Sequence, residues 1–203
     1  MLAEHPVGAV PETFALLALM HFHVARFAAR VDGSGGLLLL EEQDRRLWDR
    51  ERMRVGAEWL ARSASGDAFS RYHAEAGIAA EHCFAPTFAE TRWKEIASLY
   101  ETLERRAPSP LHTMNRAVAV AEWQGAAAAL ALLDGVAPPT WLEASYLWDA
   151  VLGDLRRRAG HVEAFQRHRA RAILAAPTEA VRELLRRRLS APRSIVRGRG
   201  GEG

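Results

Sequence analysis

The segment from Pro108 to Gly125, PSPLHTMNRAVAVAEWQG, constrains the fold more than any other, because it combines a helix start, a helix body and a helix stop in one short run. Ser109 can cap the helix with its hydroxyl group, and Pro110 suits the first helical position, where a backbone N–H is not needed. Apolar and small residues then recur every three or four positions along one face, at Leu111, Met114, Val118 and Ala121. We therefore expect a central helix that neighbouring helices approach closely.

Apolar periodicity and turn residues predict an all-α protein along the rest of the chain. The expected helices cover residues 11–31, 41–62, 67–84, 126–133, 140–160, 161–175 and 179–189, and one more runs from a capping box at Thr87–Glu90 to Pro108. Leu37–Leu40 is too short for a helix and is expected as a buried connection across the core. Gly125 and Gly160 lie 35 residues apart at predicted turns, close to the roughly 34-residue period of tetratricopeptide repeats. This spacing predicts an irregular, tetratricopeptide-like array of helical hairpins.

Length and composition are those of an ordinary globular protein, with 203 residues, of which 49% are hydrophobic and 26% charged. No apolar run reaches the roughly 20 residues that span a membrane, and the first residues lack the positive region and cleavage site of a secretion signal. We therefore expect a cytoplasmic protein with no membrane partner. The single cysteine, Cys83, excludes an internal disulfide and a cysteine-based zinc site. We expect one helical domain over residues 1–189, followed by an Arg/Gly-rich tail without stable structure over residues 190–203.

Charge is distributed unevenly along the chain. Residues 1–150 carry 14 Lys and Arg against 20 Asp and Glu, whereas residues 151–203 carry 13 against 5. A basic end of this kind can contact nucleic acid or an acidic protein face. Alternatively, Arg156–Arg158 and Arg186–Arg188 form the solvated faces of two terminal helices, which the absence of interleaved aromatic residues favours.

The most enzyme-like group of residues is His73, Glu75, His82 and Cys83. His73-Ala74-Glu75 matches the first half of the zinc-deaminase signature, in which a carboxylate works on a metal-bound water, but the second half, Pro-Cys-x-x-Cys, is missing. His21 and His23 face different sides of a helix, which argues against joint metal binding. His23 is instead expected as a core or capping histidine.

Several longer segments resemble the C-terminal extension of a group of extracytoplasmic-function sigma factors of bacterial RNA polymerase. They follow one another in the family's order: LLALMHFHVAR (Leu16 to Arg26), LEEQDRRLWDR (Leu40 to Arg50), YHAEAGIAAEHC (Tyr72 to Cys83), TRWKEIASLYETL (Thr91 to Leu103), PSPLHTMNRAVAVAEWQG (Pro108 to Gly125) and Leu152 to Arg158. The resemblance implies a helical, tetratricopeptide-like accessory domain that follows two promoter-reading domains, neither of which is present in this chain. Three residues depart from the family pattern, since Glu75 stands where many relatives carry Gln, and His21 and Phe22 replace leucines.

Strong polar side chains interrupt helices that are otherwise apolar, and we predict that they line an interaction surface: Arg26, Gln43, Asp44, Arg45, Asn115, Arg116 and Glu122. One interpretation is that these groups bind a peptide or another domain. The other is that they bond to backbone carbonyls and helix ends of neighbouring helices, as most buried polar groups do, and hold the helices together.

The predicted function is that of a non-enzymatic regulatory domain of a sigma factor, acting in transcription initiation by protein contact. The expected partners are the sigma factor's promoter-reading domains, core RNA polymerase, or both, and DNA is reached only indirectly. No catalytic residue, cofactor or metal is expected, and the sequence identifies no small-molecule ligand. A stand-alone tetratricopeptide-like adaptor is the alternative, and a metal-dependent hydrolase or deaminase is a third interpretation.

Overall fold

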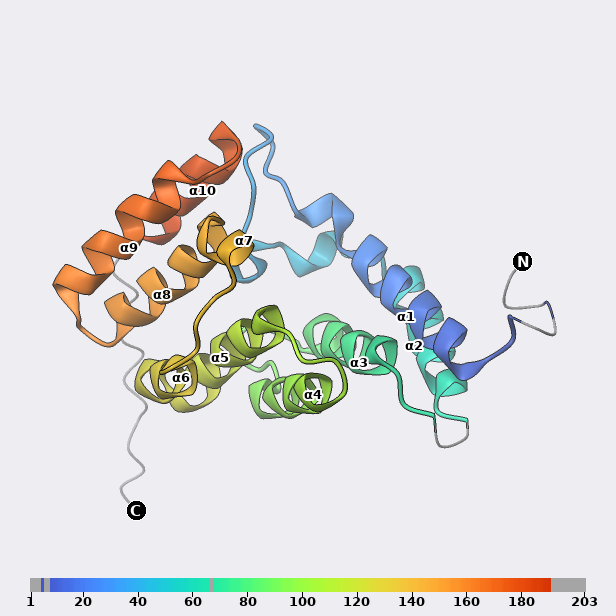
Figure 1. The fold of residues 1–203 in the computed structure, drawn as a ribbon. Helices are drawn as coiled ribbons and strands as arrows, with labels where there is room; N and C mark the ends of the chain where they lie inside the picture. Colours follow the sequence, from blue (N-terminus) through green and yellow to red (C-terminus); the bar gives the residue numbers. More distant parts are fainter. Residues whose placement is uncertain (1–4, 6–7, 66–67, 191–203) are drawn as a thin grey trace, which may run out of the picture. The chain divides into compact units, whose positions relative to one another are not determined.

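The computed structural model describes residues 5, 8–65 and 68–190, and the regular structure in these ranges is helical (Figure 1). Extended pairing in the same ranges is limited to a single antiparallel bridge between Val31 and Leu37. The chain divides into two compact units, Met1–Thr140 and Trp141–Gly203, which we call the N-terminal unit and the C-terminal unit. The predicted all-α class is confirmed. Apart from Ser190, the predicted tail lies outside the described residues.

In the N-terminal unit the helices pack in the order of the chain. Contacts join α1 to both α2 and α3, and then α3 to α4, α4 to α5 and α5 to α6, so that successive helices form antiparallel hairpins (Figure 1). The bounds are α1 Pro11–Ala25, α2 Arg50–Ser63, α3 Arg71–Phe84, α4 Trp93–Arg106, α5 Pro110–Gln124 and α6 Ala126–Leu133. Three short 3-10 helices lie between α1 and α2: η2 Phe27–Ala29, η3 Leu40–Glu42 and η4 Arg45–Leu47.

The core of the N-terminal unit forms where α1, α2 and α3 meet. Phe22 is fully buried there, and Trp48, Met53 and Cys83 are each only 2% exposed. Alanines on α1 and α3 complete the cluster, and their small side chains allow the helix backbones to approach closely: Ala18, Ala25, Ala76 and Ala79. Farther along the chain, α5 contributes Met114, Ala117 and Ala121 to the interior; of its predicted apolar stripe, Met114 and Ala121 are buried, whereas Leu111 and Val118 are half-buried.

The C-terminal unit is built on a hairpin of α8 (Tyr146–Arg158) and α9 (Val162–Leu174), with α10 (Glu179–Arg188) packed against α9. The short helix α7 (Thr140–Glu143) precedes it. Alanines and leucines fill the interior: Ala150, Ala172, Ala176, Leu185 and Leu189. The hydroxyl groups of Ser145 and Thr178 accept hydrogen bonds from backbone N–H groups at the starts of α8 and α10, which satisfies donors that a helix start leaves unpaired.

Both predicted glycine turns are confirmed. Gly125 separates α5 from α6 with φ of 93°, and Gly160 separates α8 from α9 with φ of 78°. An L side chain rarely adopts such an angle, whereas glycine reaches it without a steric penalty. The sequence position of each hairpin turn therefore follows from a local backbone requirement.

The predicted helix over residues 41–62 is wrong in its first half, which forms η3 and η4 before α2 begins at Arg50. Two aspartates explain the interruption. The Asp44 carboxylate accepts the Arg46 N–H at 2.9 Å, and the Asp49 carboxylate accepts the Arg52 N–H at 2.9 Å, so each starts a new helical turn. Aspartate favours such caps because its carboxylate competes for backbone donors.

Other predicted helix boundaries also differ from the observed ones. The Thr87 hydroxyl accepts the Glu90 N–H at 3.2 Å, as in a capping box, but it donates to the Glu90 carboxylate at 2.7 Å, and α4 starts only at Trp93. The expected helix over 140–160 is split at Ser145, and the helices expected at 11–31 and 67–84 are shorter than predicted. Leu37–Leu40 is an extended, half-buried connection rather than a buried one. No helix in the described part of the chain has the length and apolar character needed to cross a membrane.

Candidate functional site

A cleft of about 430 Å³ opens in the N-terminal unit among α1, α3, α4 and α5, and we call it the central cleft. Apolar side chains form part of its wall: Leu19, Leu40, Ile78, Ala79, Leu103 and Leu111. Polar and titratable side chains form the rest: His23, Arg26, Glu75, His82, Tyr100, His112 and Asn115. Clefts of this size with a mixed lining are the usual form of small-molecule and peptide sites.

Helix geometry explains why these residues meet. On α3, Glu75, Ala79 and His82 are spaced by four and three residues, so they lie on one face over two turns. Leu19 and His23 on α1 and Leu111 and Asn115 on α5 are each four apart. Each helix therefore presents one stripe to the same space.

One end of the cleft is basic, because two arginines flank the buried ring of Trp48. The Arg26 guanidinium lies 5.5 Å from the ring centroid and the Arg45 guanidinium 4.4 Å from it. Arg45 Nη1 also donates to the carbonyl oxygens of His82 and Ala85, both at 2.8 Å, at the C-terminal end of α3, where a helix attracts cations. Within the described ranges, neither arginine forms an ion pair with a carboxylate, and Arg26 Nε is buried without a hydrogen-bond partner.

The histidines at this end are uncharged at neutral pH. Burial and the charges of Arg26 and Arg45 lower the pKa of His82 to about 4. Burial, together with Arg26 and Arg30, also lowers the pKa of His23. Imidazole rings in this state offer one donor and one acceptor each, and they leave Arg26 as the positive charge in the wall of the cleft.

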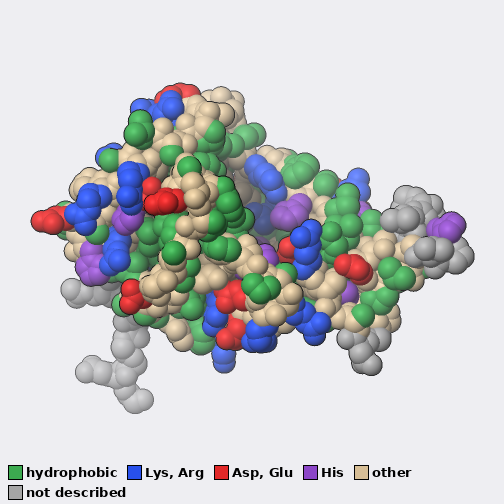
Figure 2. Space-filling model, in the orientation of Figure 1, with side chains coloured by type: hydrophobic (Ala, Val, Ile, Leu, Met, Phe, Trp, Pro, Cys, Tyr) green, Lys and Arg blue, Asp and Glu red, His purple; other side chains and the backbone are tan. Residues whose placement is uncertain are grey.

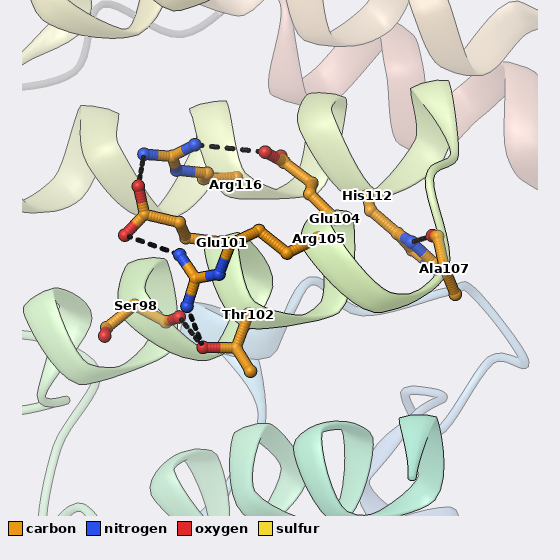
Figure 3. A network of polar contacts seen from close by, with 8 residues as sticks. All are labelled: Ser98, Glu101, Thr102, Glu104, Arg105, Ala107, His112 and Arg116. Atoms are coloured by element: carbon orange, nitrogen blue, oxygen red, sulfur yellow. Dashed lines mark hydrogen bonds and ion pairs between the residues drawn. The ribbon is translucent and has the colours of Figure 1, made fainter. Parts of the chain in front are cut away.

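The other end of the cleft is lined by the uncharged side chains of Tyr100 and Asn115 and by the acidic side chain of Glu75. Burial and the nearby charge of Glu75 raise the pKa of Tyr100 to about 12, with a side-chain hydrogen bond from Asn115 acting in the opposite direction. His112 Nδ1 lies 2.8 Å from the carbonyl oxygen of Ala107, which can only accept, so this nitrogen carries the proton and Nε2 is left as an acceptor (Figure 3).

The structure distributes the predicted interaction residues over several environments. Arg26 and Asn115 line the central cleft, and Arg45 lies behind it on Trp48. Gln43 is half-buried, and its Oε1 atom has no hydrogen-bond partner. Asp44 starts η4 and holds the Arg46 side chain. Of the predicted residues, the structure therefore brings Arg26 and Asn115 together in the central cleft.

Arg116 and Glu122, the remaining predicted residues, lie on α5. Arg116 is bound by two carboxylates of α4, with Nη2 3.0 Å from Glu101 and Nη1 3.0 Å from Glu104 (Figure 3). Acidic and basic side chains lie next to one another over α4 in the space-filling view (Figure 2). Glu122 is half-buried. The contacts of Arg116 are those of a group that holds two helices together.

Sequence reasoning named five of the seven polar residues that line the cleft but did not predict that they meet there. Of the two roles predicted for His23, core or cap, the core role is wrong, because the residue is exposed in the last turn of α1; its Nδ1 atom lies 3.5 Å from Arg30 Nη2. Tyr100 and His112 were not singled out, although Tyr100 lies three residues from Leu103 on α4 and His112 lies three residues from Asn115 on α5, and both partners also line the cleft. Helical spacing was the sequence signal that these residues share a face, but it does not distinguish a face that lines a cleft from one in the core.

The deaminase-like residues do not converge on one site. The His73 ring accepts the Ser70 N–H at Nδ1 (3.0 Å) and donates from Nε2 to the Ser63 carbonyl oxygen (3.1 Å), which fixes it as a buried cap of α3. Cys83 is buried in the core, and burial raises the pKa of its thiol to about 11. In the part of the chain that the structure describes, no three His, Cys, Asp or Glu side chains are grouped to hold a metal ion.

Several arginines of the C-terminal unit form ion pairs with two buried aspartates. Asp154 on α8 is 3% exposed and lies 2.7 Å from Arg157, 3.7 Å from Arg158 and 3.7 Å from Arg188. Asp149, 5% exposed, accepts from His168 at 2.7 Å and from Arg171 at 2.8 Å. These pairs link α8 to α9 and α10, and so favour a structural role for part of the basic end.

Comparisons with known proteins leave the function open. Residues 1–64 match a family of unknown function (DUF6596). The chain is similar to a protein of Rhizobium meliloti (strain 1021) named "Uncharacterized protein R00370", with 34% identity over 192 residues. The match covers 93% of this chain and 45% of that protein, so the chain spans less than half the length of this relative. No solved structure matches the chain.

Proposed function

We propose that this chain is a regulatory, non-enzymatic domain of an extracytoplasmic-function sigma factor, and that the central cleft is its functional site. One observation carries the proposal. All residues that line the cleft fall within five of the segments by which the chain resembles the sigma-factor extension. Those segments lie on different helices, separated along the chain, yet they contribute to a single cleft.

The chemistry of the cleft supports binding rather than catalysis at neutral pH. A general acid or base works best with a pKa near the operating pH. The pKa of His82 is instead lowered to about 4 and that of Tyr100 raised to about 12, so neither changes its charge near pH 7. His73 and Cys83 are engaged in the interior, which leaves the deaminase interpretation without its metal ligands.

The hairpin array supports the same proposal, because arrays of this kind bind partners far more often than they catalyse. The longer Rhizobium meliloti relative is consistent with a domain that works within a larger protein. The proposal implies a cytoplasmic location, where RNA polymerase acts, and contact with DNA only through the promoter-reading domains.

A pull-down tests the proposal. The chain is used as bait for core RNA polymerase and the promoter-reading sigma domains from the same genome, at low and high salt, with Asn115→Ala as the cleft variant and Arg46→Gln as the control. Arg46 is exposed and bound only to Asp44 nearby. We expect retention by the wild type and the control, and at least a fivefold loss with Asn115→Ala.

Two other outcomes would redirect the assignment. Retention that disappears at high salt in all three proteins would assign the contact to exposed arginines rather than to the cleft. No retention at either salt would contradict the sigma-factor proposal and favour a stand-alone adaptor, for which the genomic sequence upstream of Met1 should then encode no promoter-reading domain in frame.

A further inference from the structure

Among the residues that the structure describes, the half-buried Arg26 has no acidic partner for its guanidinium, whereas the half-buried Arg116 and Arg157 each pair with carboxylates. The position of Arg26 is set by α1, whose C-cap it forms, and by the ring of Trp48. Its Nε atom is buried without a hydrogen-bond partner, and the same is true of His82 Nδ1 on the facing helix α3. A buried cation without a counter-ion is costly, so an anion that reaches this end of the cleft gains a strong interaction.

The charge at this end fits a single negative charge. His23 and His82 are neutral for the reasons given above, and Arg45, which also contacts the Trp48 ring, does not line the cleft and has Nη1 already bonded to two carbonyl groups. Arg26 is then the one lining cation among the residues described for the cleft. A guanidinium presents parallel N–H groups that match the two oxygens of a carboxylate.

The rest of the cleft indicates which kind of ligand body it can hold. Six apolar side chains line it, and Glu75 lies seven residues from His82 on α3, which corresponds to about 10 Å along the helix axis. A ligand with its carboxylate at Arg26 therefore extends along apolar wall before it reaches Glu75, Tyr100 and Asn115. A second carboxylate at that far end would meet the negative charge of Glu75.

We infer that the central cleft binds a small organic monocarboxylate with an apolar body, anchored by Arg26 at the carboxylate end. This inference rests on the proposed function only for the activity that ligand binding would regulate. Binding itself is a property of this chain alone, so either inference can fail without the other.

Isothermal titration of the full chain with three probes of similar length tests the inference. Octanoate carries one carboxylate, octanamide replaces it with a neutral amide, and suberate adds a second carboxylate at the far end. All are used below the concentrations at which they aggregate. We expect octanoate to bind at least tenfold more tightly than either of the other two.

Variants assign the effect to named residues. Arg26→Gln should weaken octanoate binding at least tenfold, whereas Arg46→Gln, which changes an exposed arginine outside the cleft, should leave it unchanged. Glu75→Gln should strengthen suberate binding several-fold and leave octanoate binding within twofold, which gives a gain that loss of folding cannot produce. Circular dichroism checks the fold of each variant.

The inference is overturned by any of three results: no binding of octanoate to the folded wild type, equal affinities for octanoate and octanamide, or octanoate binding that survives Arg26→Gln. Tighter binding of suberate than of octanoate would also contradict it, because the ligand class would then be a dicarboxylate.

Discussion

The two units of this protein handle buried charge in opposite ways. In the C-terminal unit the buried charges are aspartates, and basic side chains surround them: Arg157, Arg158 and Arg188 around Asp154, and His168 and Arg171 around Asp149. At the basic end of the N-terminal unit's central cleft, the half-buried Arg26 and the neighbouring Arg45 contact the indole ring of Trp48, and Arg45 also donates to carbonyl groups, whereas neither pairs with an acid in the described residues. Paired charges link helices, whereas the unpaired Arg26 is available to a ligand.

The same contrast exists within the N-terminal unit. Arg116 and Arg26 were predicted together as members of one interaction surface, because both are strong polar groups on apolar helices. Arg116 is matched by Glu101 and Glu104 across α4 and α5, but Arg26 has no such partner in the described part of the chain. A prediction of function from a polar residue on an apolar helix therefore needs the partner as well as the residue.

The largest expected effect concerns the paired charges of the C-terminal unit. Asp154→Ala leaves three arginines without their shared carboxylate, and breaking a buried ion pair in this way typically costs several kcal/mol. We expect the free energy of unfolding of the C-terminal unit to fall by about 3 kcal/mol, measured by urea denaturation followed by circular dichroism. Glu183→Ala, which removes an exposed partner of Arg186, is the control and should cost less than about 0.5 kcal/mol. Equal effects of the two substitutions would contradict the assignment.

Arg116→Ala should lower the free energy of unfolding by about 2 kcal/mol, because it leaves the half-buried Glu104 carboxylate without its partner across the helix pair. Glu101 is 46% exposed and contributes less. Urea denaturation checks this value, and a double-mutant cycle with Glu104→Ala isolates the pair. Arg105→Ala, whose side chain is exposed, should change stability by less than about 0.5 kcal/mol. A cycle that gives no coupling between Arg116 and Glu104 would remove the contrast with Arg26.

Acid should weaken the N-terminal unit through His82. Its pKa is about 4 in the folded protein and near 6.5 when unfolded, so the unfolded state takes up the proton first as the pH falls. The stability contribution is therefore complete above about pH 6.5 and is lost progressively down to about pH 4. Between pH 7.5 and pH 5.5 we expect the wild type to lose about 1.5 kcal/mol more than His82→Gln, by urea denaturation at both values. Equal losses in the two proteins would mean that burial and the charges of Arg26 and Arg45 do not lower the pKa of this ring.

The smallest expected effect is that of Arg26→Gln on stability. No ion pair is lost, and the contact with Trp48 is worth on the order of 1 kcal/mol or less, so the free energy of unfolding should change by less than about 1 kcal/mol. The same substitution is expected to abolish most of the octanoate affinity. A loss of stability as large as that of Arg116→Ala would show that Arg26 holds the fold together and would end the distinction between the two arginines.

Local sequence signals predicted much of the secondary structure and little of the site. The cap at Ser109 and the turns at Gly125 and Gly160 were readable because each depends on neighbours in the chain. The helix expected over 41–62 failed because its acidic run looked like an exposed helix face, whereas Asp44 and Asp49 each start a new turn. A carboxylate that caps and one that is solvated have the same sequence signature over so short a span.

By itself, the sequence determined that this protein is all-α, where its hairpins turn and which helix faces are apolar, because backbone conformation and helix periodicity are set by residues within about one or two turns of each other. Only the tertiary structure decided that Arg26, Glu75, His82, Tyr100 and Asn115 share one cleft, and that Arg116 belongs to Glu101 and Glu104. These groups lie on different helices, and the contacts between helices depend on which faces pack together. That choice is made by the burial of the whole core and is not encoded at any one position.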